Sequence, residues 1–221
     1  TSSNTETPAT DTGNTSNPEA GTTPITTNPV VLKAGHITAS NILSNSGSIT
    51  TSGALTVNAS DAINNSGAIR TASIKSQNNA NITATTAVHN QGSLQAQNLT
   101  ITAPTIDNNQ GNLTGEQVLN LNASGQITNV EGSIAGKALH LNTRQLDNTK
   151  GSISTSSDLT LDNAHLDNST GSISAKNLIL NNRTLANTDG QLLASEGLTS
   201  TADSIINSNG TIAAGTTLTV N

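Results

Sequence analysis

A short motif that recurs at a nearly constant interval constrains the fold of this chain more than any other feature of its sequence. A glycine followed two positions later by Ile or Leu forms a series at Gly47, Gly67, Gly92, Gly111, Gly132, Gly151, Gly171, Gly190 and Gly210. The intervals between successive glycines of this series are 20, 25, 19, 21, 19, 20, 19 and 20. Repeats of this length are typical of solenoids, in which each unit buries its apolar residues only by stacking on its neighbours.

Each repeat contains three short apolar segments at fixed offsets. In the unit that starts at Gly151 they are G-S-I at 151–153, L-T-L at 159–161 and L-D-N at 166–168. These segments alternate apolar and polar residues with a period of two, which predicts strands rather than amphipathic helices. The sequence therefore predicts an all-β fold, a right-handed parallel β-helix of about nine coils with three short strands per coil. At about 4.8 Å per coil such a stack makes a rod of roughly 45 Å.

The composition is compatible with a folded domain only if the few aliphatic residues recur with a regular period. Thr, Asn, Ser and Gly contribute 36, 31, 26 and 18 residues, so 111 of the 221 residues belong to these four types, and no Phe, Tyr or Trp is present. Such a composition is otherwise typical of disorder, because it provides few side chains to bury. The core must consist of Leu, Ile, Val and Ala, stacked coil on coil.

The N-terminal segment, residues 1–29, differs from the repeats. It contains Pro8, Pro18, Pro24 and Pro29, three acidic residues and no basic residue. We expect residues 1–29 to be a flexible linker and residues 30–221 to be the repeat domain. Because Leu218-Thr219-Val220 fills the second segment of a last coil that has no third segment, we also expect this domain to be a fragment of a longer array.

An asparagine ends the third segment of each unit, two or three positions before the next repeat glycine. Stacked amides could form a hydrogen-bonded ladder at this corner, and we expect the following glycine to supply backbone freedom there. A ligand-binding stripe is the alternative, but the presence of Asn at every corner favours a structural role. The series consists of Asn45, Asn65, Asn90, Asn108, Asn129, Asn148, Asn168, Asn187 and Asn207.

One unit is longer than the others. Ile82 follows Gly67 at an offset of 15, where the second segment of other units begins at an offset of 7 or 8, which predicts that about seven residues near 71–78 bulge from the stack. Surface insertions sometimes carry binding. Lys75, Gln77 and Asn78 are therefore candidate contacts for a partner, with simple tolerance of an extra loop as the alternative.

Acidic residues at a repeated position are the candidates for chemistry. Asp107, Asp147 and Asp167 each precede a ladder asparagine, and the last two belong to adjacent coils, so we expect them about 5 Å apart. Such a pair could bind a cation weakly or, with Asp162, serve a polysaccharide lyase. Solvated carboxylates are favoured, because Thr128 occupies the intervening coil and no basic residue recurs beside the pair.

Other classes of site have little support in the sequence. The four histidines, His36, His89, His140 and His165, are expected in different positions of the repeat, which predicts no metal-binding pair. There is no Cys, and eight Lys and Arg without aromatic residues argue against a nucleic-acid surface. No apolar stretch approaches the ~18 residues of a membrane span. We predict no catalytic, cofactor-binding or metal-binding residues.

The repeat itself resembles that of a known family. From Gly151 to Gly171 it reads G-S-I-S-x-x-x-x-L-x-L-D-N-x-x-L-D-N-x-x-G, and related copies extend over residues 35–221. This pattern resembles the repeats of filamentous haemagglutinins and related two-partner-secretion exoproteins, including the contact-dependent growth inhibition effector CdiA. The resemblance implies a secreted protein on the surface of a Gram-negative bacterium, exported unfolded through an outer-membrane transporter that recognises a region outside this segment.

The function expected from this resemblance is structural. We expect a stalk segment, without catalysis or cofactor, that presents an adhesive or toxin region to target cells. The alternatives are a segment that itself binds a target-cell receptor or glycan and, more distantly, a β-helical polysaccharide lyase. No nucleic acid is expected as a partner, and this segment is not expected to insert into a membrane.

Overall fold

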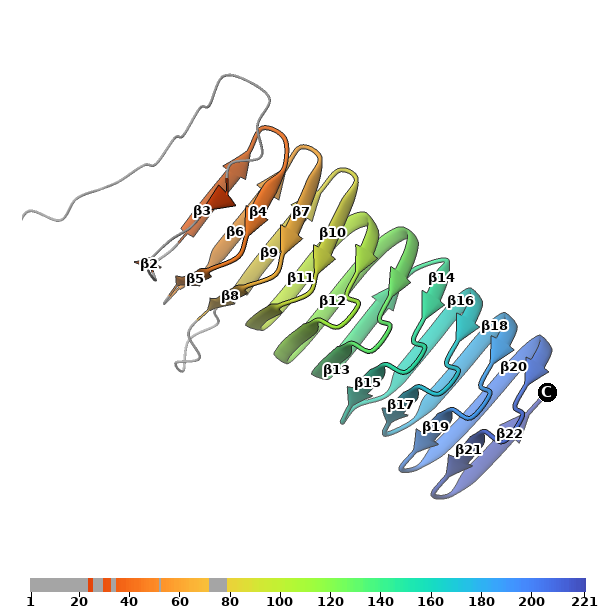
Figure 1. Cartoon of the computed structure of the whole chain (residues 1–221). Helices are drawn as coiled ribbons and strands as arrows, with labels where there is room; N and C mark the ends of the chain where they lie inside the picture. Colours follow the sequence, from red (N-terminus) through yellow and green to blue (C-terminus); the bar gives the residue numbers. More distant parts are fainter. Residues whose placement is uncertain (1–23, 26–29, 33–34, 52, 72–78) are drawn as a thin grey trace, which may run out of the picture.

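The fold is a β-solenoid of about nine turns (Figure 1). The computed structural model describes residues 24–25, 30–32, 35–51, 53–71 and 79–221. These residues form 22 β-strands and no helix, and the strands of successive turns pair in parallel. The predicted all-β fold of stacked parallel coils is therefore confirmed. No helix in this part of the chain is long and apolar enough to cross a membrane.

Each complete turn contributes one segment to each of three faces. The first face follows the repeat glycine and contains β2 (Val30–Leu32), β5 (Ser48–Thr51), β8 (Ala68–Thr71), β15 (Ser152–Thr155), β17 (Ser172–Ala175), β19 (Gln191–Ala194) and β21 (Thr211–Ala214). The second face contains β3 (Gly35–Ala39), β6 (Leu55–Ala59), β9 (Asn79–Ala84) and β22 (Thr217–Val220). The third face contains β1 (Pro24–Ile25), β4 (Leu43–Asn45), β7 (Ala62–Asn65), β10 (Ala87–Asn90) and β14 (Gln145–Asp147).

Six longer strands bend through the corners and belong to more than one face. They are β11 (Ser93–Asp107), β12 (Asn112–Thr128), β13 (Ser133–Asn142), β16 (Leu159–Asp167), β18 (Leu178–Ala186) and β20 (Gly197–Ile206). In these turns two or three of the predicted short segments are joined into one continuous strand. Their pairing with the neighbouring turn continues around the corner, interrupted in the β11–β12 ladder by register shifts at Ala96/Asn98 and Ala103/Thr105. Such irregularities bend a strand without ending it.

The core is a column of aliphatic side chains. In β9 the side chains alternate between exposed and buried, and the same inward positions pair with one another from turn to turn, as Ile82 does with Val57 and Ile101. Parallel stacking thereby places aliphatic residues on aliphatic residues, and one turn buries Ile153, Leu159, Leu161 and Leu166. Without aromatic side chains, the narrow cross-section of each coil is filled by about four such residues.

The two strands nearest the N-terminus bear on the expected boundary between the linker, residues 1–29, and the repeat domain. Strand β1 pairs with β4, Pro24 opposite Ser44, although it falls inside the range 1–29 predicted as a linker. Strand β2 pairs with β5, beginning at Val30, where the fold was expected to start. Residues 1–23 and 26–29 lie outside the described residues.

The insertion in the long unit is shorter than the sequence predicted. Ala80, rather than Ile82, lies opposite both Leu55 and Leu99. Ala80 lies at an offset of 13 from Gly67, whereas Leu55 lies at an offset of 8 from Gly47, so the insertion is about five residues instead of seven. A small Ala occupies the position that holds Leu in the two neighbouring turns, so the first large aliphatic residue of A-N-I-T-A, Ile82, lies two residues after the start of the equivalent segment.

Candidate functional site

The corner after the third face is built on a row of inward-pointing asparagines. Each Nδ2 donates to the Oδ1 of the asparagine in the next turn, at 2.7–2.8 Å, from Asn45 through Asn207. The same Nδ2 donates to the carbonyl oxygen of the following repeat glycine at 3.1–3.4 Å. The first eight asparagines are at most 2% exposed. The predicted hydrogen-bonded ladder is confirmed.

The repeat glycines serve this corner differently from the prediction. None of the described glycines has a positive φ; the residue before the glycine does, in the last six corners, at Gln110, Glu131, Lys150, Thr170, Asp189 and Asn209, with φ of 53–61°. Glycine is required because the turns approach closely: a Cβ added to Gly151 would lie 2.0 Å from the carbonyl oxygen of Asn129. The expected backbone freedom of the glycine is therefore wrong, and lack of space is the reason for its presence.

The left-handed residue is held by the neighbouring turn. In the corner Asn148–Gly151 the glycine N–H donates to Asn148 O at 3.0 Å, with the positive φ at the third residue, as in a type II turn. The N–H of Lys150 then donates to Ser169 O of the next turn at 3.0 Å. Stacking thus compensates for a conformation that costs a non-glycine residue free energy.

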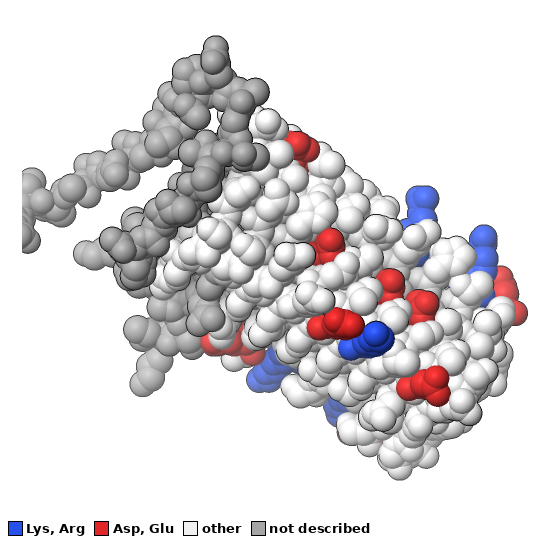
Figure 2. Space-filling view, in the orientation of Figure 1, with Lys and Arg blue, Asp and Glu red and all other residues white. Residues whose placement is uncertain are grey.

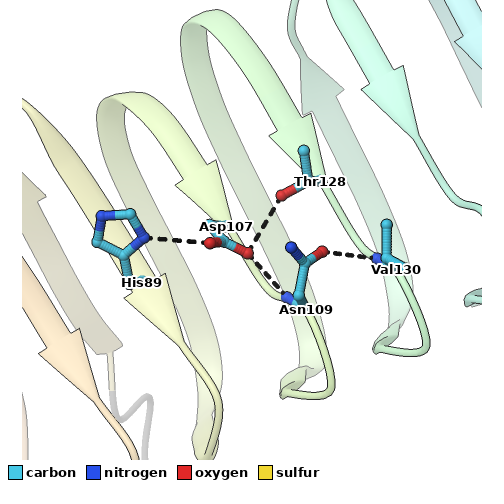
Figure 3. A network of polar contacts seen from close by, with 5 residues as sticks. All are labelled: His89, Asp107, Asn109, Thr128 and Val130. Atoms are coloured by element: carbon cyan, nitrogen blue, oxygen red, sulfur yellow. Dashed lines mark hydrogen bonds and ion pairs between the residues drawn. The ribbon is translucent and has the colours of Figure 1, made fainter.

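A row of polar side chains points outwards beside this ladder, on the third face. Asp107 accepts three hydrogen bonds there (Figure 3): Oδ1 from Asn109 N at 3.0 Å and Thr128 Oγ1 at 3.2 Å, and Oδ2 from His89 Nδ1 at 3.2 Å. The amide of Asn109 continues the network to Val130 N at 2.8 Å. The carboxylate therefore connects three successive turns at the corner.

Asp147 and Asp167 occupy the same row and lie directly opposite one another on adjacent turns. One oxygen of each accepts a backbone N–H of the following corner, from Thr149 and from Ser169, both at 2.9 Å. The expected adjacency of these two carboxylates is confirmed, as is the position of Thr128 between them and Asp107. Like charges opposite one another in a sheet are destabilising.

This acidic pair lines a shallow hollow on the third face. The hollow has a volume of about 320 Å³, and its polar rim includes Gln126, Gln145 and His165. His165 Nδ1 lies 2.7 Å from Thr184 Oγ1, so this contact uses one ring nitrogen and does not involve Nε2. Carboxylates, amides and an imidazole together offer both donors and acceptors to a polar ligand.

Other charges are dispersed over the rod. In the view of Figure 2 the acidic and basic side chains are scattered in small groups, some with red and blue side by side, and most lie on the turns away from the N-terminus. Two exposed pairs link adjacent turns, Lys150–Glu131 at 3.4 Å and Lys176–Glu196 at 3.5 Å. Exposed ion pairs of this kind contribute little to stability.

Comparison with known families accounts for the repetition. The model of the haemagglutinin repeat matches residues 9–92, 78–130, 132–183 and 180–221, which include nearly all of the solenoid. The chain belongs to the haemagglutinin repeat family. Proteins of this family are typically secreted, surface-associated exoproteins of a structural and adhesive kind. No curated protein and no solved structure matches the chain significantly.

The residues considered for a lyase do not converge in this haemagglutinin repeat domain. Asp162 lies on the second-face part of β16, where Asn181 Nδ2 donates to its Oδ1 at 2.6 Å, whereas Asp147 and Asp167 lie on the third face. Within the described ranges no group of three or more His, Asp or Glu side chains is placed to hold a metal ion. Lys75, Gln77 and Asn78, the candidate partner contacts, lie outside the described residues.

Two features of the histidines differ from or add to the prediction. His36 and His140 share one outward row of the second face, which contradicts their assignment to different positions; they are five turns apart, with Thr56, Asn81, Thr100 and Asn120 between them. The contact of His89 with Asp107 was missed. Its signal in the sequence is that each residue directly precedes a ladder asparagine.

Proposed function

We propose that this chain is a segment of the stalk of a secreted, cell-surface exoprotein, which holds an adhesive or toxin region away from the producing cell. The observation that carries the proposal is the unbroken asparagine ladder, which joins nine successive corners. A structure that repeats the same inward contacts in every turn is suited to spanning a distance.

Stability distributed along the rod supports this role. A turn that buries about four aliphatic side chains gains ~1.5 to 3 kcal/mol from each, before the entropy of ordering is counted. Because each turn interacts mainly with its neighbours, the length of the stalk depends on the number of turns, at about 4.8 Å each. Removal of a turn should therefore shorten the rod and preserve its fold.

Export and presentation complete the proposal. Family membership favours a Gram-negative cell surface and a two-partner route, with an outer-membrane transporter as the export partner. The lack of cysteine suits passage of an unfolded chain, since no disulfide has to form. The parent is either an adhesin or a contact-dependent growth inhibition effector.

Deletion of one complete turn tests the stalk. Removing residues 151–170 joins Lys150 to Gly171 and restores the corner sequence Asn-Thr-Lys-Gly. We expect small-angle X-ray scattering to show a rod about 4.8 Å shorter, with an unchanged sheet spectrum in circular dichroism. The matched control removes residues 151–160, half a turn, and should unfold the surrounding coils. Equal disruption by both deletions would contradict a modular stalk.

The hollow on the third face favours a second candidate, direct binding of a target-cell receptor or glycan. Labelled chain is titrated onto a panel of bacterial and epithelial cells, with denatured chain as the control. A stalk predicts no saturable binding to any cell. Saturable binding that Asp147→Asn and Gln145→Ala abolish, while Asn142→Ala retains it, would make this chain an adhesin segment. Loss of binding when Lys75, Gln77 and Asn78 are together replaced by alanine would instead assign the contact to the insertion.

A further inference from the structure

The outward side of the second face is an array of threonine and asparagine side chains. Outward positions lie two residues apart in each strand, as Asn81 and Thr83 do in β9, where exposed and buried side chains alternate. Each such position lies opposite the equivalent one in the next turn, as Thr100 lies opposite both Asn81 and Asn120. Two rows of side chains therefore run along the rod, and successive turns stack in nearly the same orientation (Figure 1).

These two rows contain almost no charge. Their described positions hold only Thr or Asn, apart from His36, His140, Asp162 and Ile179. Asp162 is the one carboxylate at these described positions, although the whole chain has a net charge of -6. The centres of protein interfaces are depleted of charged residues in the same way. A second copy of the chain can therefore approach this face with little repulsion between facing side chains.

The size of the array suits an interface between two chains. Ten strands contribute to the second face, from β3 to β22. Nine steps of about 4.8 Å and a width of five residues at about 3.3 Å, the length of β3, give a surface of about 43 by 16 Å. Pairing through this face would cover about 700 Å² on each partner, close to the ~800 Å² of a standard interface.

The side chains of the array are complementary to themselves. A Thr hydroxyl and an Asn amide both donate and accept hydrogen bonds, so two copies of the same row can pair. Few of these groups are used within the chain: Asn120 Nδ2 donates to Thr100 Oγ1 at 3.3 Å, but the side chains of Thr102 and Asn122 have no partner among the described residues. Stacked rows of identical side chains also form the interfaces between paired sheets in cross-β assemblies.

The regular repeat of the array favours one kind of partner. A contact made at one turn recurs at the next only if the partner has the same spacing of about 4.8 Å. A second copy of this solenoid meets that condition along the whole rod. The other faces are less suited to such pairing: the third presents Asp147 and Asp167, which would meet like charges, and β15 of the first presents only the short side chains of Ser152 and Ser154.

We propose that two copies of this chain associate side by side through their second faces, with the threonine and asparagine rows of one copy packed on those of the other. This inference goes beyond the stalk role and does not depend on it. The polar groups exchange hydrogen bonds with water for hydrogen bonds across the interface, so the net gain from each is small. We expect a dissociation constant in the micromolar range, which leaves the chain monomeric in dilute solution.

Sedimentation velocity and small-angle X-ray scattering over a range of concentrations test the association. We expect the mass to double, while the particle keeps the length of one rod and its cross-section grows. A mass that remains that of one chain up to about 1 mM would overturn the proposal. A dimer of doubled length would also overturn it, because the contact would then lie at the ends of the rod.

A charge placed on the second face tests the site of contact. Asn120→Lys would bury an unpaired cation near the middle of the array and should weaken association at least tenfold. Because it makes the net charge less negative, repulsion between whole chains cannot explain the loss. Asn112→Lys is the matched control, since it makes the same change on the first-face part of the same strand, β12, and should leave association unchanged. Equal effects of the two variants would refute the second face as the contact.

Opposite charges distinguish a lost contact from a lost fold. Circular dichroism should show an unchanged sheet spectrum for Asn120→Lys. An equimolar mixture of Asn120→Lys and Asn120→Glu should associate more tightly than either variant alone, because the two faces then carry opposite charges. A mixture that associates no more tightly than the separate variants would contradict pairing through this face.

Discussion

Removal of one ladder amide provides the sharpest test of how the rod is held together. Asn129 is fully buried, accepts from Asn108 at 2.7 Å and donates to Asn148 at 2.7 Å. Its Nδ2 also lies 3.2 Å from the carbonyl oxygens of Gly132 and Ser152, and because the amide has only two hydrogens these two acceptors share one N–H. At a net ~1 kcal/mol for each of three hydrogen bonds, and with the stranded Oδ1 of Asn148 added, we expect Asn129→Ala to lose about 4 kcal/mol.

Urea denaturation followed by circular dichroism measures the loss. Asn142→Ala is the matched control, because this asparagine is exposed on the second face, and its effect should stay within about 0.5 kcal/mol. Asn207→Ala, at the exposed end of the ladder with two contacts of 2.7 and 3.1 Å, should give an intermediate loss. If Asn129→Ala and Asn142→Ala differ by less than about 1 kcal/mol, the ladder is not a main source of stability.

Three further substitutions test the corner and the acidic pair. Gly151→Ala forces a Cβ against Asn129 O and should lower the free energy of unfolding by about 3 kcal/mol or more, whereas Gly125→Ala, whose nearest contact is 3.1 Å, should be tolerated in the same denaturation assay. Thr170→Gly should raise the free energy of unfolding by about 1 kcal/mol, because a β-branched residue there has a φ of 55°; an unchanged midpoint would refute this strain. Asp147→Asn keeps the acceptor for the corner and removes a like-charge contact, so it should stabilise the chain by a few tenths of a kcal/mol at low salt, and a gain that persists at high salt would exclude this cause.

The residues around the hollow and the buried asparagines show which contacts between turns the repeat spacing predicts and which it does not. Asp147 and Asp167 could be paired from the sequence because the repeat length carries each residue to the same position one turn later. His89 and Asp107 obey the same rule, yet the 18-residue offset and the change of residue type concealed their contact. Asn163 and Asn182 have the composition of the ladder, but they occupy a different corner with different acceptors.

The sequence by itself determined the strands, the coil repeat, the aliphatic core and the asparagine ladder, because each follows from residues that recur at fixed spacing along the chain. The tertiary structure alone decided why the repeat glycines are needed, which residue adopts the left-handed conformation and which carbonyl oxygens the buried Asn163 and Asn182 contact. These depend on the approach of one turn to the next, within about 3 Å at hydrogen-bonded atoms. A spacing in the sequence specifies which residues meet, but only the stacked turns specify how closely their atoms approach.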